Sequence, residues 1–258
     1  MRSKAFGISV LCALLPVVAA AEDRAEDWQF RATVYGYFPS IEGSTRFDTP
    51  VSEVDIEAGD LIENTEFAAM ASFEIRKGRF GGFTDLIYMD VGDSINDSTS
   101  LALGSIPLPP GVTADASLDV RAWAWTLAAT WRAVSADRTA LDVFAGARLL
   151  DAEADLDVAL NVGTQVAGHA SRDNWDAIVG VKGRLRFGAD GRWFVPYYLD
   201  VGTGDSDLTA QLATGVGYAI NRTEVFAAWR YLDYDLGSDA GMKNLDFRGP
   251  AIGISYRF

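Results

Sequence analysis

The chain has 258 residues, of which 49% are hydrophobic and 12% aromatic, and its formal net charge is −14 at pH 7. This acidic balance argues against nucleic-acid binding, because phosphate contacts need clustered Lys and Arg. The one cysteine, Cys12, lies in an apolar N-terminal run, so the remainder of the chain has no disulfide or thiol chemistry.

The N-terminus has the three parts of a secretory signal peptide. Arg2 and Lys4 give a positive start, residues 6–18 form the apolar run, and residues 19–21 are alanines before Glu22. The run is too short to cross a bilayer as a helix. We therefore expect residues 1–21 to be removed and residues 22–258 to form one domain.

After this segment the sequence contains no apolar run long enough for a membrane-spanning helix. A membrane protein without such runs must be a closed β-barrel, since only helices and closed barrels satisfy every backbone group in lipid. The composition, with 25 Gly, 7 Trp, 9 Tyr and 14 Phe, suits a barrel with aromatic girdles. It also suits a secreted β-sandwich, so composition alone does not decide.

The first strand is predicted over residues 28–38, where Trp28, Phe30, Ala32 and Val34 share one face. A long polar segment follows over residues 39–64, and residues 55–62 in it are expected to form a helical turn or two. The next strand covers residues 66–76. A tight turn at residues 77–79 then leads directly into a strand over residues 80–91.

From here long loops alternate with short turns. The predicted loops are residues 92–117, 152–172 and 236–243, and the predicted turns are residues 135–138, 188–191 and 221–222; the connection at residues 204–207 is also tight. Short turns on one side and longer loops on the other are typical of outer-membrane barrels. We count about ten strands, with eight or twelve left open, because residues 80–91 and 118–131 carry large side chains on both faces.

The last stretch, RGPAIGISYRF over residues 248–258, alternates in steps of two. Ile252, Ile254, Tyr256 and Phe258 form one apolar face, and small or polar residues and Arg257 form the other. The final strand of a barrel must close against the first, with its aromatic end at the lipid interface. A terminal Phe fits that place.

Charged residues in the predicted strands lie opposite the apolar stripes. The candidate interior network consists of Asp142, Arg148, Asp176, Lys182, Arg184, Asp200 and Arg230, joined by Arg31, Glu66, Glu74 and Glu224. A Lys or Arg facing lipid at the midplane costs roughly 2–4 kcal/mol, so in a barrel these side chains must point inward. In a sandwich the faces would be reversed. The signal peptide, the aromatic C-terminus and aromatic residues at strand ends favour the barrel.

Several stretches, among them AIVGVKGRLRF, WRYLDYDL and GPAIGISYRF, carry a resemblance that spans residues 28–258. The chain resembles a family of small Gram-negative outer-membrane β-barrel proteins with an opacity-like closing hairpin, whose members mostly have no assigned activity. The resemblance implies a closed antiparallel up-and-down transmembrane β-barrel in the cell outer membrane. It brings no catalytic residues.

The partners expected for such a barrel are outer-membrane lipid and lipopolysaccharide, together with the barrel-insertion machinery, which would engage the C-terminal strand ending at Phe258. We expect a monomer that binds no nucleic acid.

The sole histidine, His169, lies on a predicted outer loop. Ser171, Asp173 and Asp176 are near it in sequence, but their spacing forms no triad signature, so a lipid or peptide hydrolase on the barrel rim is the least favoured function. One histidine and no cysteine make a poor transition-metal site. The acids Asp93, Asp97, Asp205 and Asp207 match no calcium loop, and residues 202–206 (GTGDS) lack the lysine of a phosphate loop. We expect no catalytic residue, no metal and no cofactor.

The interior network has two interpretations. The favoured one is a set of ion pairs that plugs a narrow lumen, and the other is a water-filled pore with charge selectivity. The predicted function is therefore a non-enzymatic outer-membrane barrel, structural or a small passive channel. The alternative is a surface-binding barrel that acts through its outer loops.

Overall fold

The computed structural model describes residues 27–45, 54–56, 65–95, 114–160, 163, 165–236 and 242–258. The signal peptide predicted at residues 1–21 lies outside these ranges. The described residues are almost all β-strand, and no helix among them is long and apolar enough to cross a membrane.

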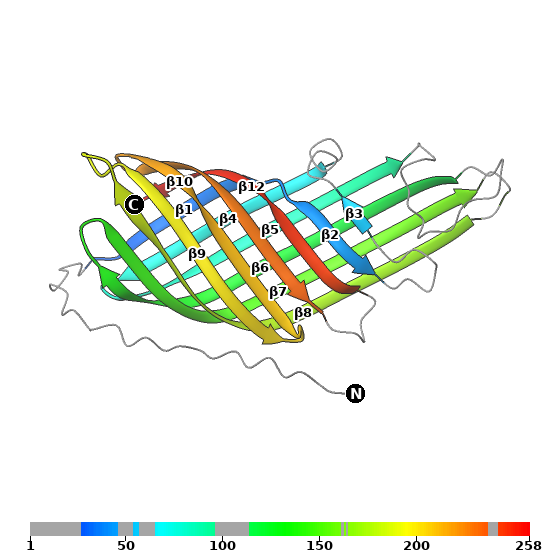
Figure 1. Cartoon of the computed structure of the whole chain (residues 1–258), viewed down its shortest axis with the longest axis horizontal. Coiled ribbons are helices and arrows are strands. Elements are labelled where there is room, and N and C mark those ends of the chain that lie inside the picture. The colour runs from blue at the N-terminus through cyan, green and yellow to red at the C-terminus, as the bar shows by residue number, and fades with distance from the viewer. Residues whose placement is uncertain are drawn as a thin grey trace, which may run out of the picture.

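The strands follow the chain in order: β1 (Gln29–Tyr37), β2 (Ser40–Thr45), β3 (Val54–Ile56), β4 (Thr65–Lys77), β5 (Phe80–Ile95), β6 (Ala114–Ser135), β7 (Thr139–Leu160), β8 (Gln165–Phe187), β9 (Trp193–Gly204), β10 (Leu208–Ile220), β11 (Thr223–Asp235) and β12 (Met242–Arg257). β4 to β12 are neighbours in sequence order, and β1 lies between β4 and β12 (Figure 1). All pairs are antiparallel.

The pairing of β1 with β12 closes the sheet into a ten-stranded barrel. Its register runs from Arg31 opposite Arg257 to Tyr37 opposite Ala251. Beyond it, the backbone N–H of Phe30 donates to the carbonyl of Phe258 at 3.0 Å and that of Phe258 donates back at 3.1 Å. Closure removes the exposed strand edges that would otherwise carry unpaired backbone groups. The predicted antiparallel barrel is confirmed, with ten strands.

β2 and β3 are additions to the barrel wall. Strand β1 ends at Tyr37. After Phe38 and Pro39, β2 resumes the pairing with β12, from Ser40 opposite Arg248 to Thr45 opposite Met242. β3 pairs with β2. The helical turn expected over residues 55–62 is wrong for Asp55 and Ile56, which lie in β3, because strand pairing with β2 gives these backbone groups partners. Residues 57–62 lie outside the described ranges.

The loop predicted at residues 152–172 is also wrong. β7 and β8 stay paired from Thr139 opposite Leu185 to Ala159 opposite Gln165. The prediction failed because the alternation changes phase in this segment: the acids Asp151, Glu153, Asp155 and Asp157 have the outward parity, while the backbone pairing continues unchanged. β5 and β6 likewise extend into the predicted loop of residues 92–117.

The two ends of the barrel differ. We call the end with the tight turns after β4, β6, β8 and β10 the turn end, and the opposite end, reached by the long strands β5 to β8, the loop end (Figure 1). The backbone has positive φ at Gly78, Gly188, Gly191 and Asn221, all in turn-end connections. Glycine adopts this conformation without steric cost, and asparagine tolerates it.

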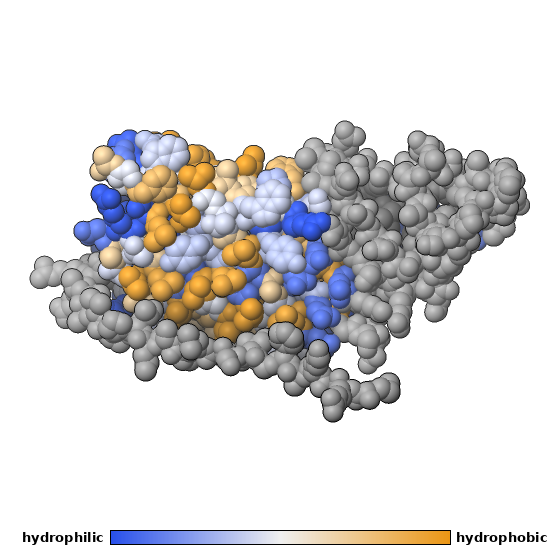
Figure 2. All heavy atoms as spheres, viewed as in Figure 1, coloured by the Kyte–Doolittle hydropathy of each residue, from blue (hydrophilic) through white to orange (hydrophobic). Residues whose placement is uncertain are grey.

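The outward face of the barrel is an apolar belt, seen as orange patches over the wall in Figure 2. Val34 is 64% exposed, Trp229 57% and Ile252 57%, although each lies in the middle of a paired strand. In a sandwich these side chains would form the buried core. Their exposure agrees with the predicted barrel faces. Exposed aromatic side chains lie at the turn end (Trp28, Phe80, Phe187, Trp193, Phe258) and farther toward the loop end (Trp123, Trp125, Trp175).

Candidate functional site: the barrel interior

The inward-facing side chains form successive levels along the barrel axis. On β7 they run from Asp142 near the turn end through Phe144 and Arg148 to Leu150. The alternation of strand side chains puts all four on the same face. β11 repeats this sequence of types with Glu224, Phe226, Arg230 and Leu232. The interior therefore has a charged level, an aromatic level, a second charged level and an apolar level.

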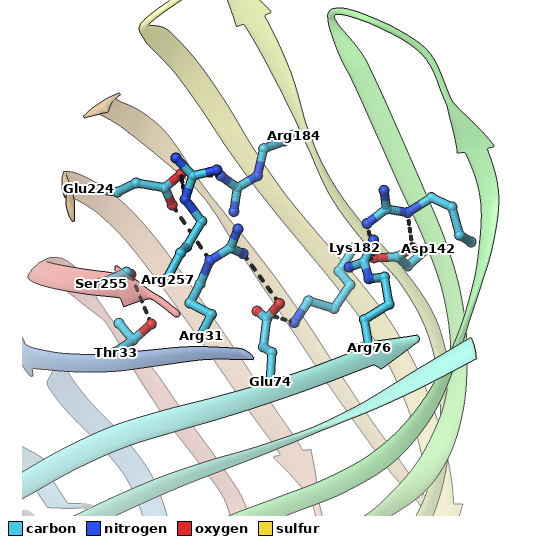
Figure 3. Close-up of polar contacts among 11 residues, drawn as sticks. Arg31, Thr33, Glu74, Arg76, Asp142, Lys182, Arg184, Glu224, Ser255 and Arg257 are labelled. Atoms are coloured by element: carbon cyan, nitrogen blue, oxygen red, sulfur yellow. Dashed lines mark hydrogen bonds and ion pairs between the residues drawn. The ribbon is translucent and has the colours of Figure 1, made fainter. Parts of the chain in front are cut away.

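The level at the turn end surrounds a cavity of about 230 Å³, which we call the cationic chamber. Its charged lining residues are Arg31, Glu74, Arg76, Arg132, Asp142, Lys182, Arg184 and Glu224. They come from β1, β4, β6, β7, β8 and β11, and their side chains converge in Figure 3. The charged lining of the chamber therefore depends on six strands that are brought together by the closed barrel.

Each carboxylate of the chamber contacts more than one cation (Figure 3). Glu74 accepts a hydrogen bond from Lys182 Nζ at 2.7 Å and one from Arg31 Nη1 at 3.3 Å. Asp142 accepts one from Arg76 Nη2 at 3.0 Å and two from Arg132. These shared contacts hold the basic side chains in place while leaving more positive than negative charge.

Glu224 is shared most widely. Arg184 Nη1 donates to its Oε1 at 2.7 Å, and Arg31 Nε and Arg257 Nε lie 3.6 Å and 3.4 Å from its carboxylate. The Nε atoms of Arg31 and Arg257 are buried and have no hydrogen-bond acceptor. Buried donors are normally hydrogen-bonded, so these two are exceptions, as are the Nε atoms of Arg172 and Arg230 outside the chamber.

The aromatic level closes the chamber on its loop side. Phe83 meets Phe144 edge to face with ring centroids 5.2 Å apart, and Tyr198 lies 5.1 Å from Phe144. Lys182 Nζ lies 4.0 Å from the centroid of Phe83, a cation–π contact that holds the ammonium against this level. The aromatic rings separate the chamber from the second charged level.

The second charged level, which we call the Arg148 layer, is built around two arginines. Arg148 forms a bidentate ion pair with Asp200, and Arg230 pairs with Asp85 at 3.0 Å. Gln211 Oε1 accepts from both arginines at 3.0 Å. Arg148 and Asp200 are each only 1% exposed. A water-filled pore would expose them, so the interior is closed at this level.

Beyond the Arg148 layer the interior is mostly apolar, with the buried pair of Asn174 and Ser206 as a polar exception. This apolar cap contains Tyr37, Met70, Ile87, Met89, Ala122, Leu150, Ala152, Leu232, Tyr234, Leu236, Phe247 and Ala251, all buried in one cluster. It explains why residues 80–91 and 118–131 are hard to phase from sequence. Ile87 and Met89 point into the barrel, whereas Trp123 and Trp125 point out of it.

All seven candidate network residues point inward, but they do not form one network. Asp142, Lys182 and Arg184 lie in the cationic chamber, and Arg148, Asp200 and Arg230 lie in the Arg148 layer. Asp176 stands apart and accepts from the hydroxyl and backbone N–H of Ser206 at 2.8 Å and 2.9 Å. The side chain of Glu66 lies outside the described part of the chain.

The network predicted from sequence did not include three basic residues that pair with the carboxylates of the chamber: Arg76, Arg132 and Arg257. The signal for Arg76 was available, since it has the parity of Glu74 on β4. Arg132 precedes a register shift between residues 132 and 134, which interrupts the alternation by which its face could be read.

His169 does not lie on a loop as expected. It sits in β8, opposite Asp155 of β7, and its Nδ1 is 2.6 Å from Asp155 Oδ1. Both side chains are more than half exposed. Asp176 has the opposite strand parity and is buried, so it is not a partner of His169. Of the acids considered for calcium, Asp205 accepts from the backbone N–H of Trp175 at 2.9 Å.

A second cavity of about 430 Å³ opens at the turn end of the barrel. Its basic lining residues are Arg31, Arg76, Arg222 and Arg257, and Glu74 is its one acidic lining residue among the described side chains. Because Arg31, Glu74 and Arg76 line both cavities, the chamber adjoins the turn-end mouth.

No family model matches the chain, and no curated protein matches it. The chain is similar to the solved structure of the outer membrane protease OmpT from Escherichia coli, with 11% identity over 90% of this chain and 97% of that one and a TM-score of 0.48. It is also similar to Ail, the attachment invasion locus protein of Yersinia pestis (9% identity over 90% of this chain and 99% of that one, TM-score 0.35), and to the P. putida toluene transporter TodX (11% identity over 89% of each chain, TM-score 0.32). Similarities of this size assign neither an activity nor a site residue.

Proposed function

We propose that the protein is an integral outer-membrane β-barrel with a closed interior and a structural, non-enzymatic role. The apolar belt supports the membrane location, since it surrounds a barrel whose charged side chains pair with one another inside. The turn end would face the periplasm and the loop end the exterior, as is usual when short turns lie on one side of a barrel.

The observation that carries the structural role is the Arg148 layer. A passive channel requires a hydrated path, and the bidentate pair of Arg148 and Asp200 fills the interior and is shielded from solvent. The apolar cap adds a second barrier. Of the two roles expected from sequence, a plugged scaffold is therefore better supported than a small passive channel.

Single-channel recording tests this. The purified full chain inserted into a planar bilayer should give no discrete conductance steps at voltages where a general porin, used as the positive control, conducts. Flotation with lipid vesicles in the same preparation verifies insertion. Discrete steps from an inserted barrel would contradict the closed interior, whereas failure to float would contradict the membrane location.

A second candidate function is contact with the cell exterior through the loop end. β6, β7 and β8 have 22, 22 and 23 residues. About 9–11 residues suffice for a strand to cross a membrane, so these strands would project a paired sheet well beyond it. Such a sheet offers a surface for lipopolysaccharide or other external partners.

A further inference from the structure

The cationic chamber carries more positive charge than its own carboxylates neutralise. Seven basic and three acidic side chains line it and the adjoining turn-end cavity. The bases are Arg31, Arg76, Arg132, Lys182, Arg184, Arg222 and Arg257, and the acids are Glu74, Asp142 and Glu224. The chain as a whole has a net charge of −14, so this local excess runs against the overall balance.

Concentrating like charges in a confined space is costly unless a counter-charge is present. A plug made only of ion pairs would need about as many acids as bases. The chamber instead shares each carboxylate among two or three bases and leaves the Nε donors of Arg31 and Arg257 without an acceptor. An anion from outside would supply both the missing charge and acceptors for hydrogen bonds.

Apolar and aromatic side chains form the remaining part of the chamber wall. Phe194 of β9, Phe226 of β11 and Tyr198 line the cavity, and the described residues there carry no charge on β9 and β10. The two phenylalanine rings reach glycines on neighbouring strands: a Cβ on Gly217 would be 2.2 Å from Phe194 Cζ, and one on Gly253 would be 2.5 Å from Phe226 Cζ. The guanidinium of Arg184 lies over Phe194, with its Cζ 5.0 Å from the ring centroid, so the bases and the aromatic side chains adjoin each other in the chamber.

The chamber has one open side. The turn-end cavity shares lining residues with it, whereas the aromatic level and the Arg148 layer block the other direction. A molecule that enters must leave by the same route.

We propose that the cationic chamber is a dead-end binding site for a small organic anion, with a phosphate or carboxylate group among the bases and an apolar body against Phe226 and Tyr198. Guanidinium groups match the geometry of both oxyanions. The site would bind its ligand from the turn end without passing it across the barrel.

Calorimetric titration of the detergent-folded full chain with phenyl phosphate tests the proposal and does not depend on the membrane location. Saturable binding is expected. Lys182→Met should weaken it about tenfold, the equivalent of about 1.4 kcal/mol, and leaves Glu74 paired with Arg31. Arg132→Gln should act similarly and leaves Asp142 paired with Arg76. Absence of saturable binding by the folded wild-type chain would overturn the proposal.

Arg121→Gln is the matched control, because it removes the same charge from an exposed position outside the chamber. It should leave the affinity unchanged, and an equal loss in all three variants would overturn the site by indicating nonspecific attraction. Circular dichroism establishes that each variant is folded. Inorganic phosphate, which lacks the ring, should bind about tenfold more weakly than phenyl phosphate. Equal affinities would overturn the role of the aromatic wall.

Discussion

At the scale of single residues, the interior shows how buried charges depend on their partners. Arg148 lies among Asp200, Thr126, Thr209 and Gln211, so its guanidinium is surrounded by acceptors. Removing one partner of such a pair leaves an uncompensated buried charge, which costs more than the pair itself contributes. The Arg148 layer is therefore sensitive to the loss of either ion.

We expect Arg148→Ala to destabilise the barrel by about 3–5 kcal/mol, because the buried carboxylate of Asp200 would lose its ion-pair partner. Urea unfolding of the protein in lipid vesicles, followed by tryptophan fluorescence, measures the change. The double variant Arg148→Met with Asp200→Leu is the control and should recover most of the loss. A cost below about 1 kcal/mol for the single variant would mean that water reaches this level.

At the scale of elements, the long hairpin of β7 and β8 combines two roles. Its turn-end part, with Asp142 and Lys182, belongs to the barrel and lines the cationic chamber. Its loop-end part, with Asp155 and His169, is a paired sheet with exposed side chains. The same backbone pairing thus continues through both parts, although only the first has an apolar outward face.

A shortened hairpin separates these roles. Replacing residues 154–170 with Asn-Gly joins Glu153 to Ser171, which already face each other in register. The barrel should keep its unfolding midpoint, while binding to immobilised lipopolysaccharide should fall at least about tenfold if the loop end is the contact surface.

The matched control is Arg222→Gly, which creates the same Asn-Gly turn at the other end of the barrel. It should leave lipopolysaccharide binding intact. Unchanged binding by the shortened chain would argue against the loop-end sheet as the contact surface.

At the scale of the whole molecule, the barrel reverses the arrangement of a soluble protein. Val34, Trp229 and Ile252 are more than half exposed, whereas Arg148, Asp176 and Glu224 are at most 2% exposed. This distribution is favourable only if lipid covers the outside. The closed pairing of β1 with β12 makes it possible, because the wall then contains no open edge.

The variant Val34→Arg tests that environment. An arginine in the middle of a lipid-facing belt should destabilise the barrel in vesicles by about 2–4 kcal/mol. The control Asn244→Arg places the same side chain on the exposed outward face near the loop end and should change the free energy of unfolding by less than about 0.5 kcal/mol. Equal, small effects of both variants would indicate that water covers Val34.

The sequence by itself determined the strand class, the turn-end connections and the two faces of most strands, because alternation in steps of two is a local property of the chain. The stripe from Trp28 to Val34 and the one from Ile252 to Phe258 could be read without knowledge of any partner strand. The long pairing of β7 with β8 could not, since backbone hydrogen bonds continue where the apolar stripe ends.

Only the tertiary structure decided which charges meet. Lys182 and Glu74 are 108 residues apart and come together because the sheet closes. The register of every strand pair contributes to the level at which a side chain lies, so no local pattern can assign Arg148 and Lys182 to different levels. Closure likewise determined that acids are scarce around the cationic chamber and that apolar side chains fill most of the interior beyond Arg148.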